Sequence, residues 1–251
     1  CGPAAAAASA AVYRMSIDAR HGRIDRVYTI VINGIEEEEA FAASLQMPSV
    51  RYKKTVPFAP DMGNKRLEHR PVVVGLGPAG LFAAYTLAHY GYAPLVLERG
   101  GAMDARDAAV ERFWTGGALD LNCNIQFGEG GAGAYSDGKL TTRIHDPLCD
   151  EVLRIFVQFG APEEILRLAK PHIGTDVLKG VVRAIRENIV AHGGRVCFGT
   201  TLTGLRMKSG KLAALQIDTE EIGCEQAVLA IGHSARDTFA ALYDAGLYME
   251  P

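Results

Sequence analysis

The sequence predicts an α/β fold built around a parallel sheet. Over residues 71–100, a short apolar run breaks into glycines, becomes helical and returns to a second apolar run. A long amphipathic helix is predicted over 177–192. The apolar runs that follow this helix are typical of strands, some of them in an antiparallel meander. Together these patterns predict a Rossmann-like domain, preceded by a small α/β unit.

Composition and charge argue against several classes of protein. The 251 residues are 48% hydrophobic, enough for a sizeable core, and the formal net charge of -3 provides no field that attracts phosphate backbones. We therefore expect no nucleic-acid partner. Five cysteines without a CxxC pair favour a reducing compartment, which points to the cytoplasm. No apolar run approaches the roughly 20 residues that a membrane-spanning helix needs, so no membrane association is expected.

The chain is predicted to divide into three parts. Residues 1–47 form the small α/β unit, with two strands within 12–33 and a helix over 36–46. Residues 48–70 contain prolines and lysines without a sustained period and form a linker. Residues 71–251 form the Rossmann-like domain. Because the sequence begins without Met and stops just after a helix-like segment, we expect a fragment that is incomplete at its C-terminus.

The glycine-rich turn after the first apolar run is the central motif. The run 72–74 is the strand expected in a sheet that is buried on both faces. Gly75 permits a tight turn, Gly77 lets the backbone approach a pyrophosphate, and Gly80 allows the helix to pack closely on the strand. Pro78 suits the first helical turn, where its missing N–H is not needed. The helix N-terminus is then a site for an anion.

An acidic residue supports this interpretation. The second strand, 94–98, ends in Glu98, at the distance from Gly80 where an acid accepts hydrogen bonds from ribose hydroxyls. A lone GxGxxG is weak evidence, but a strand before it, a helix after it and an acid closing the next strand predict a dinucleotide site. The alternative, a glycine-rich turn of some other α/β protein, leaves Glu98 unexplained.

The remaining elements follow from periodicity and turn residues. A helix-like segment ends near Trp114, and further helices are predicted over 151–160 and from Pro162. Asp176 is predicted to cap the long helix, which Gly193 and Gly194 end. Strands are predicted over 195–198, 201–207, 212–219 and 227–231, the last of them buried, before a closing helix over 237–245 with Ser234 as a capping residue.

A second glycine-rich segment separates this chain from simple NAD-binding domains. Five glycines lie between Gly128 and Gly138, among the polar residues Tyr135, Ser136 and Asp137. A simple dehydrogenase domain would continue with regular βα units at this point. Backbone amides in such turns can approach phosphate or flavin carbonyl groups, although many glycine segments are only close-packed turns.

Four blocks of the sequence resemble one family. They are GLGPAGLFAAYTLAHYGYAPLVLERG, NIQFGEGGAGAYSDGKLTTR, AKPHIGTD and AVLAIGHSARDTF. The chain is similar, from about residue 12 to its end, to the uncharacterised bacterial family of FAD-dependent dehydrogenases, NAD(P)/FAD-dependent oxidoreductases of the glutathione-reductase-like superfamily. Members of that family are about twice this length, so the resemblance implies that this is the N-terminal half.

The resemblance also implies roles for particular residues. The FAD diphosphate would be held by the first glycine turn, the adenosine ribose by the acid and its neighbour, and the flavin ring or substrate side would lie near the second glycine segment. The residues at the diphosphate would be Gly75, Gly77, Pro78, Ala79 and Gly80. Those at the adenosine ribose would be Glu98 and Arg99. Those near the flavin ring or its substrate side would be Gly130, Gly131, Ser136, Asp137 and Lys139. The strand ending at Gly232 would return beside the FAD.

Other residues depart from the superfamily or leave their role open. Many superfamily members carry an arginine-rich GGR-type segment after the ribose acid, whereas this chain has ERGGAMDAR at that place, with Arg106 displaced. Cys123 is expected to be an inert buried thiol, and no metal site is predicted. The candidates for catalysis are His172, which lies in a loop rich in helix breakers, and Lys139. A histidine can move protons near neutral pH, but a structural, hydrogen-bonded role for His172 stays open.

The predicted function is that of a FAD-dependent oxidoreductase acting on a small-molecule substrate, with NAD(P)H as a candidate electron donor. Two alternatives are an NAD(P)-binding dehydrogenase without flavin and a non-catalytic nucleotide-binding module. A flavoprotein that modifies RNA is disfavoured by the acidic balance. The sequence identifies neither the substrate nor the oligomeric state.

Overall fold

A computed structural model describes residues 8–54, 58–142, 144, 146–218 and 220–250. The chain forms two compact units: unit 1 comprises residues 1–63 and 139–173, and unit 2 comprises 64–138 and 174–251. This division groups 139–173 with the N-terminal residues, whereas the sequence-based boundaries place that segment in the Rossmann-like domain. The boundaries 1–47, 48–70 and 71–251 stay predictions.

Unit 1 is built on a β-hairpin. Strands β1 (Ser9–Asp18) and β2 (Asp25–Asn33) pair antiparallel, with an irregularity at Tyr13. The segment around Leu168 runs alongside β1, because the Met15 amide donates to Arg167 and its carbonyl accepts from Ala169. The other elements are a 3₁₀ turn η2 (Arg20–Gly22), helix α1 (Glu38–Ser44), helix α4 (Pro147–Gln158) and a 3₁₀ turn η4 (Glu163–Leu166).

Two predictions in this unit need correction or refinement. The helix predicted from Pro162 is wrong, since only the single 3₁₀ turn η4 forms there. The helix predicted over 151–160 exists but begins earlier. Its start is fixed by Asp146, whose side chain accepts from the Leu148 amide, and by Pro147 in the first turn.

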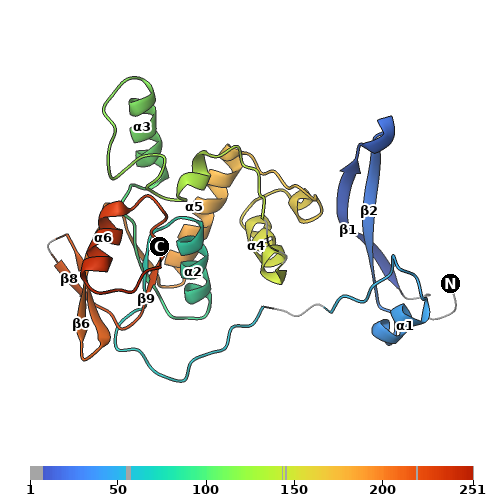
Figure 1. Cartoon of the computed structure of the whole chain (residues 1–251), viewed down its shortest axis with the longest axis horizontal. Coiled ribbons are helices and arrows are strands. Elements are labelled where there is room, and N and C mark those ends of the chain that lie inside the picture. The colour runs from blue at the N-terminus through green and yellow to red at the C-terminus, as the bar shows by residue number, and fades with distance from the viewer. Residues whose placement is uncertain (1–7, 55–57, 143, 145, 219, 251) are drawn as a thin grey trace. The chain divides into compact units, whose positions relative to one another are not determined.

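Unit 2 contains a four-stranded parallel sheet in the order β5-β4-β3-β9, which confirms the predicted α/β fold class. Figure 1 labels its edge strand, β9. A three-stranded antiparallel meander, β6-β7-β8, accompanies it. The strands are β3 (Val72–Val74), β4 (Leu95–Leu97), β5 (Arg195–Cys197), β6 (Leu202–Lys208), β7 (Lys211–Ile217), β8 (Glu220–Gly223) and β9 (Ala227–Leu229). The sequence did not predict β8 as a separate strand, and Thr219, the predicted end of the preceding strand, lies outside the described residues.

The helices of unit 2 are α2 (Pro78–His89), α3 (Met103–Trp114), α5 (Thr175–Ala191) and α6 (Arg236–Asp244), with a 3₁₀ turn η3 (Ala132–Tyr135). Helices α2 and α5 pack against each other. Gly91 and Gly193 take left-handed conformations and close the last turns of α2 and α5, and for α5 this is the predicted end. The predicted capping roles of Asp176 and Ser234 are wrong: Gly174 and Ala235 occupy the two N-cap positions, and neither helix has a side-chain cap among the described residues.

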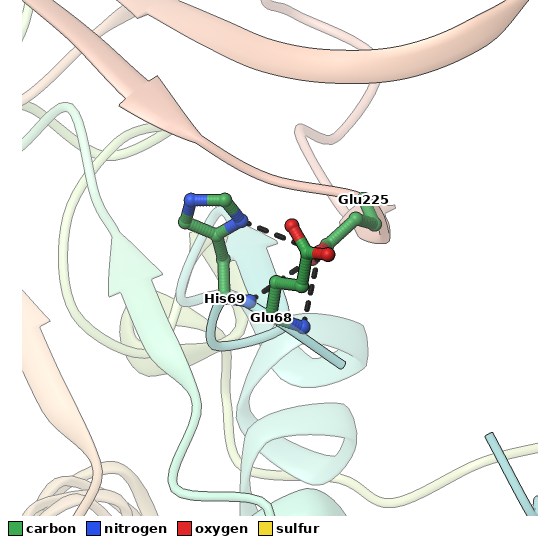
Figure 2. Close-up of side chains that lie close together, drawn as sticks. All are labelled: Glu68, His69 and Glu225. Atoms are coloured by element: carbon green, nitrogen blue, oxygen red, sulfur yellow. Dashed lines mark hydrogen bonds and ion pairs between the residues drawn. The ribbon is translucent and has the colours of Figure 1, made fainter. Parts of the chain in front are cut away.

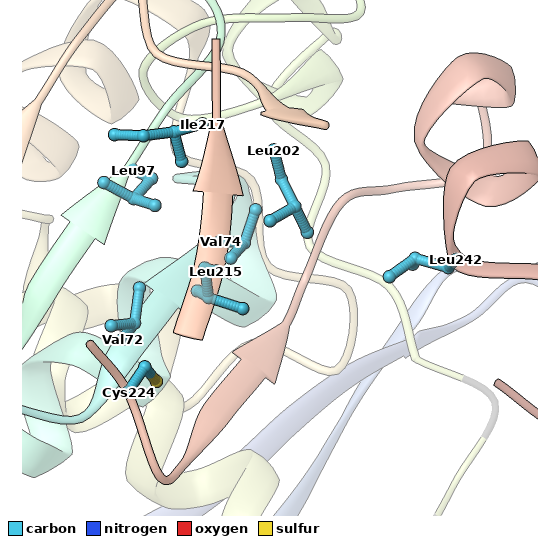
Figure 3. Packing of buried hydrophobic residues seen from close by; sticks show 8 residues of the cluster. All are labelled: Val72, Val74, Leu97, Leu202, Leu215, Ile217, Cys224 and Leu242. Carbon is cyan, nitrogen blue, oxygen red and sulfur yellow. The ribbon is translucent and has the colours of Figure 1, made fainter. Parts of the chain in front are cut away.

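The core of unit 2 lies between the parallel sheet and the meander. Val72 and Val74 share one face of β3 with period two, and they cluster with Leu97, Leu215 and other apolar side chains of the meander and α6 (Figure 3). Val73, which alternates to the other face, is also fully buried. This matches the predicted strand with two buried faces. For β9 the prediction of a buried strand is wrong, since Val228 and Leu229 are 41% and 37% exposed on a strand at the edge of the sheet.

The fold predicts opposite effects for two glycine substitutions. Gly75 has φ +98°, and an added Cβ would lie 2.3 Å from the Ala230 carbonyl oxygen, so Gly75→Ala should lower the free energy of unfolding by more than about 3 kcal/mol. Gly180 lies inside α5 with nothing within 4 Å of an added Cβ. Gly180→Ala should therefore raise the free energy of unfolding by about 0.5–1 kcal/mol. Urea denaturation measures both, and equal effects would contradict the packing at Gly75.

Candidate functional site

A cavity of about 750 Å³ lies in unit 2 at the carboxyl ends of three parallel strands. Its wall includes Val74 and Gly75 after β3, Glu98 after β4, and Ala230 after β9. Ligands of open α/β sheets bind at this edge, where loops following the strands converge. The cavity falls within the size range of small-molecule and cofactor sites.

The three motif glycines have different structural causes. A Cβ at Gly75 or Gly80 would collide with backbone, at 2.3 Å from the Ala230 oxygen and 1.9 Å from the Gly75 oxygen, so packing alone requires glycine at these positions. Gly77 has φ -73°, and among the described residues an added Cβ would meet only the Gly131 Cα, at 3.8 Å. The space that a side chain at Gly77 would occupy therefore opens on the cavity, which Gly77 lines.

The N-terminus of α2 opens on the same space. Gly77 is its N-cap, no side chain of a described residue caps it, and Pro78 occupies the first position. Pro78 and Ala79 line the cavity. The positive end of the helix dipole and the amides of the first turn are thus available to an anionic group. Gly77, Pro78 and Ala79 thus line the cavity, and their predicted role toward a diphosphate stays a prediction. Gly80 serves helix packing and is not among the described lining residues.

Glu98 lines the cavity, but its carboxylate already accepts hydrogen bonds from the protein's own backbone. Its side chain is 5% exposed, and its carboxylate accepts hydrogen bonds from the backbone amides of Leu76, Gly100 and Gly128 at 2.7, 2.8 and 2.9 Å. The predicted position at the strand end is correct, and the carboxylate also joins three loops, which spacing alone did not predict. Its predicted role toward a ribose stays a prediction.

Arg99 is also in the wall of the cavity. Its Nη2 donates to the carboxylate of Asp237 at 2.8 Å and to the hydroxyl of Thr238 at 2.9 Å, and its guanidinium lies 4.6 Å from the centre of the Phe127 ring. The hydrogen bond from Arg99 lowers the pKa of Asp237 below its usual value. Arg99 therefore fastens the end of β4 to the first turn of α6, and presents a guanidinium and an aromatic ring side by side.

The second glycine segment contributes only in part as predicted. Gly131 lines the cavity beside Gly77, together with Ala132 and Gly133, which were not predicted as site residues. Gly130 lies behind this wall, where its amide donates to the Leu76 carbonyl at 2.8 Å. Ser136 donates from its hydroxyl to the Gly133 carbonyl at 2.8 Å, and it is not among the described residues that line the cavity.

The two candidates for catalysis lie in unit 1. Lys139 and His172 pair with each other through an isolated antiparallel β-bridge, and the Leu140 amide beside them donates to the Pro171 carbonyl. Neither residue is among the described residues lining the cavity of unit 2. Their bridge joins the two ends of the segment 139–173, which explains the unexpected grouping of that segment as one body.

Residues that follow strand β9 form another part of the cavity wall. Gly232, a predicted site residue, lines the cavity with φ +69°, and it is followed by the lining residues His233 and Ser234. The Ser234 hydroxyl contacts the Gln126 side chain at 3.3 Å and not a helix amide. The sequence analysis did not predict Phe127 as a site residue, because an aromatic residue before a glycine segment carries no periodic signal.

A buried ionic network shapes the loop beside the cavity. Arg106 and Glu129 are both fully buried. The Arg106 guanidinium donates to the carbonyls of Asn124, Ile125 and Glu129 at 2.9, 2.8 and 2.6 Å, and the Glu129 carboxylate accepts from the Met103 amide and from Arg186. Arg106, which departs from the superfamily pattern in sequence, therefore holds the loop 124–129 in place.

Cys123 lies at the start of this loop. Its sulfur accepts a hydrogen bond from the Gly101 amide at 3.3 Å, and the residue is partly buried. This packing agrees with a structural thiol.

Three side chains with metal-ligating atoms converge outside the cavity, at Glu68, His69 and Glu225 (Figure 2). Both oxygens of Glu225 accept backbone amides, from Glu68 at 3.0 Å and His69 at 3.2 Å, and its carboxylate lies 3.3 Å from the His69 Nδ1. These bonds hold the segment before β3 against the turn before β9. The arrangement is explained by this structural role, and it does not change the prediction that the site has no metal.

Comparisons with known proteins give similarity to a protein of unknown role by sequence and distant likenesses among solved structures. No protein-family model matches the chain. An uncharacterized protein of Clostridium beijerinckii is 54% identical over 188 residues, which cover 75% of this chain and 35% of that protein. The chain thus spans about a third of the length of this relative.

Among solved structures, THI4 of Thermovibrio ammonificans is 20% identical with a TM-score of 0.48, covering 71% of this chain and 62% of that chain. Glycine oxidase of Bacillus cereus is 12% identical with a TM-score of 0.45, covering 70% and 59%. Likenesses this distant assign no function. Within the described part of the chain, no helix is both long and apolar enough to cross a bilayer.

The contacts of Glu98 predict a stability effect. In Glu98→Gln, the side-chain NH₂ group replaces one accepting oxygen and faces backbone amides that also donate, so the free energy of unfolding should fall by about 1–3 kcal/mol. Glu111→Gln, an exposed change on α3, is the matched control and should change it by less than about 0.5 kcal/mol. Urea denaturation compares them, and equal stability of the two variants would contradict the bonds assigned to Glu98.

Proposed function

We propose that unit 2 binds FAD and that the chain is the nucleotide-binding part of a flavin-dependent oxidoreductase. The observation that carries the proposal is that no packing contact among the described residues requires glycine at Gly77. The space that a side chain would fill there is open and faces the uncapped N-terminus of α2. A backbone free of side chains beside helix amides is the arrangement that accepts a diphosphate. The resemblance of the sequence to FAD-dependent dehydrogenases supports the choice of FAD over other dinucleotides.

In this proposal, the cavity wall divides between the two ends of the cofactor. Gly77, Pro78 and Ala79 hold the diphosphate, with Gly131 beside Gly77 in the same wall. Glu98 lies at the adenosine ribose. Its carboxylate oxygens accept from the ribose hydroxyls with the lone pairs that the three backbone amides do not occupy. The flavin, when bound, supplies hydride or electron transfer, while the protein supplies binding and electrostatics.

The reaction of the whole protein is a further part of the proposal. A small-molecule substrate and NAD(P)H as electron donor follow from the same resemblance. His172 and Lys139 stay candidates for proton transfer, and the isolated thiols support a cytoplasmic location.

A spectrum tests the cofactor. The full-length protein, purified mildly and reconstituted with FAD, should show flavin absorption that is retained after removal of free FAD. Anaerobic addition of NADH or NADPH should then bleach it if a nicotinamide is the donor. A protein that retains no FAD but is stabilised against heat by NAD(P) would instead support a dehydrogenase without flavin.

The open position of Gly77 gives a specific prediction. Gly77→Ala should fold normally, since its Cβ meets only an ordinary van der Waals contact among described atoms, but the methyl group enters the proposed diphosphate space. The Kd for FAD should rise by at least about tenfold, equivalent to about 1.4 kcal/mol. Isothermal titration calorimetry measures it, with Gly180→Ala as the control that leaves Kd unchanged. An unchanged Kd in Gly77→Ala would place the diphosphate elsewhere.

A further inference from the structure

Tyr135 ends the short turn that forms one wall of the cavity. The turn η3 spans Ala132–Tyr135, and Ala132 and Gly133 within it line the cavity, as does the preceding Gly131. A Cβ on Gly131 would lie 2.9 Å from the Gly77 Cα, so the two backbones approach closely. The turn therefore packs directly against the start of α2, and its position sets the shape of the cavity wall beside Gly77.

The Tyr135 side chain is held by two helices. Its hydroxyl donates to the carboxylate of Asp107 on α3, which also accepts from Lys179 of α5 at 2.6 Å. Burial raises the pKa of Tyr135 above its usual value, and the hydrogen bond to Asp107 adds to the effect. The hydroxyl thus keeps its proton and remains a donor. For Asp107, burial alone would raise the pKa, but the bonds from Lys179 and Tyr135 outweigh it and lower the pKa.

The ring of Tyr135 contacts two cationic side chains. The Lys179 Nζ lies 4.5 Å from the ring centre and the Arg106 Cζ lies 4.7 Å from it, within the range of cation–π attraction. The Trp114 ring adds an edge contact at 6.3 Å. Arg106 is the residue that also orders the loop 124–129, so the tyrosine connects that loop, α3 and α5 at one point.

The glycines of the segment cannot position themselves. Gly130, Gly131 and Gly133 carry no side chains, and glycine has more conformational freedom to lose than any other residue. Gly130 is held at one end by its amide bond to Leu76, and Tyr135 is the large side chain that holds the other end. A tyrosine fixed by a hydrogen bond and two cations can supply this constraint without entering the cavity.

We propose that Tyr135 is a positioning residue for the diphosphate of the dinucleotide: through Asp107, Lys179 and Arg106 it holds the turn Ala132–Tyr135 in place against the start of α2, where both border the space that the diphosphate occupies. This inference rests on the proposed function of the cavity. It assigns to Tyr135 an effect on one part of the ligand, the diphosphate, and none on the adenosine, which lies toward Glu98.

Dissection of the ligand tests the inference. The affinities of the FAD-free full-length protein for FAD, ADP and adenosine are measured by calorimetry, with competition for the weak ligand. In Tyr135→Leu, which removes both the hydrogen bond and the ring, the Kd values for FAD and ADP should rise by at least about tenfold, while that for adenosine should stay within about twofold. Tyr135→Phe keeps the ring and loses only the bond to Asp107, so the loss of affinity should be selective for the same ligands but smaller.

The controls separate positioning from general stability. Tyr243→Leu removes an exposed tyrosine of α6 and should change none of the three affinities. Should Tyr135→Leu fail to fold, the selectivity of Tyr135→Phe decides the question. Equal losses for FAD, ADP and adenosine, or no loss for FAD and ADP, would overturn the inference. A wild-type protein that binds neither FAD nor ADP would instead overturn the proposed function, and the inference with it.

Discussion

Three loops of unit 2 depend on one buried carboxylate. Glu98 accepts amides from the first glycine turn, from the segment after β4 and from the second glycine segment, at Leu76, Gly100 and Gly128. Without a common acceptor, these amides would be buried donors without partners, each at a cost of about 1–3 kcal/mol. The acid that closes the second strand is therefore part of the construction of the cavity, whatever it contributes to a ligand. This dual use explains why the two glycine segments, far apart in sequence, form one wall.

Around this carboxylate, side chains hold the outside of the loops and glycines face the inside. Arg106, Glu129 and Tyr135 bind the loops from behind, through carbonyl contacts, an ion pair and ring contacts. Gly77 and Gly131 leave the inner surface as bare backbone. Rigid supports behind a surface without side chains suit a site that must hold a phosphate-bearing ligand close to backbone amides.

The sequence predicted the features that neighbouring residues determine, and it missed the features that depend on contacts between distant parts of the chain. The strand–turn–helix unit and the position of Glu98 are encoded within about thirty residues, so spacing was sufficient. The environment of Tyr135 requires α3 and α5 to meet, and the buried role of Arg106 requires a loop twenty residues away. The capping roles given to Asp176 and Ser234 failed because glycine at Gly174 and a tertiary contact to Gln126 were satisfactory alternatives. The grouping of Lys139 and His172 in unit 1 had no signal in local periodicity.

The order of strands in the sheet also has a consequence for folding. Strand β3 pairs with β4 soon after it in sequence, but its other neighbour is β9, so that Val72 meets Ala227 only after most of the chain is available. Pairing across such a separation is slow, because the entropy cost of closing a long loop comes before the strand contacts that offset it. Until then, the free edge of β3 can pair with other chains. The meander β6-β7-β8 has only local pairings and can form early. Since Ala230 and Gly232 are part of the cavity wall, the cavity is complete only once this long-range pairing has formed.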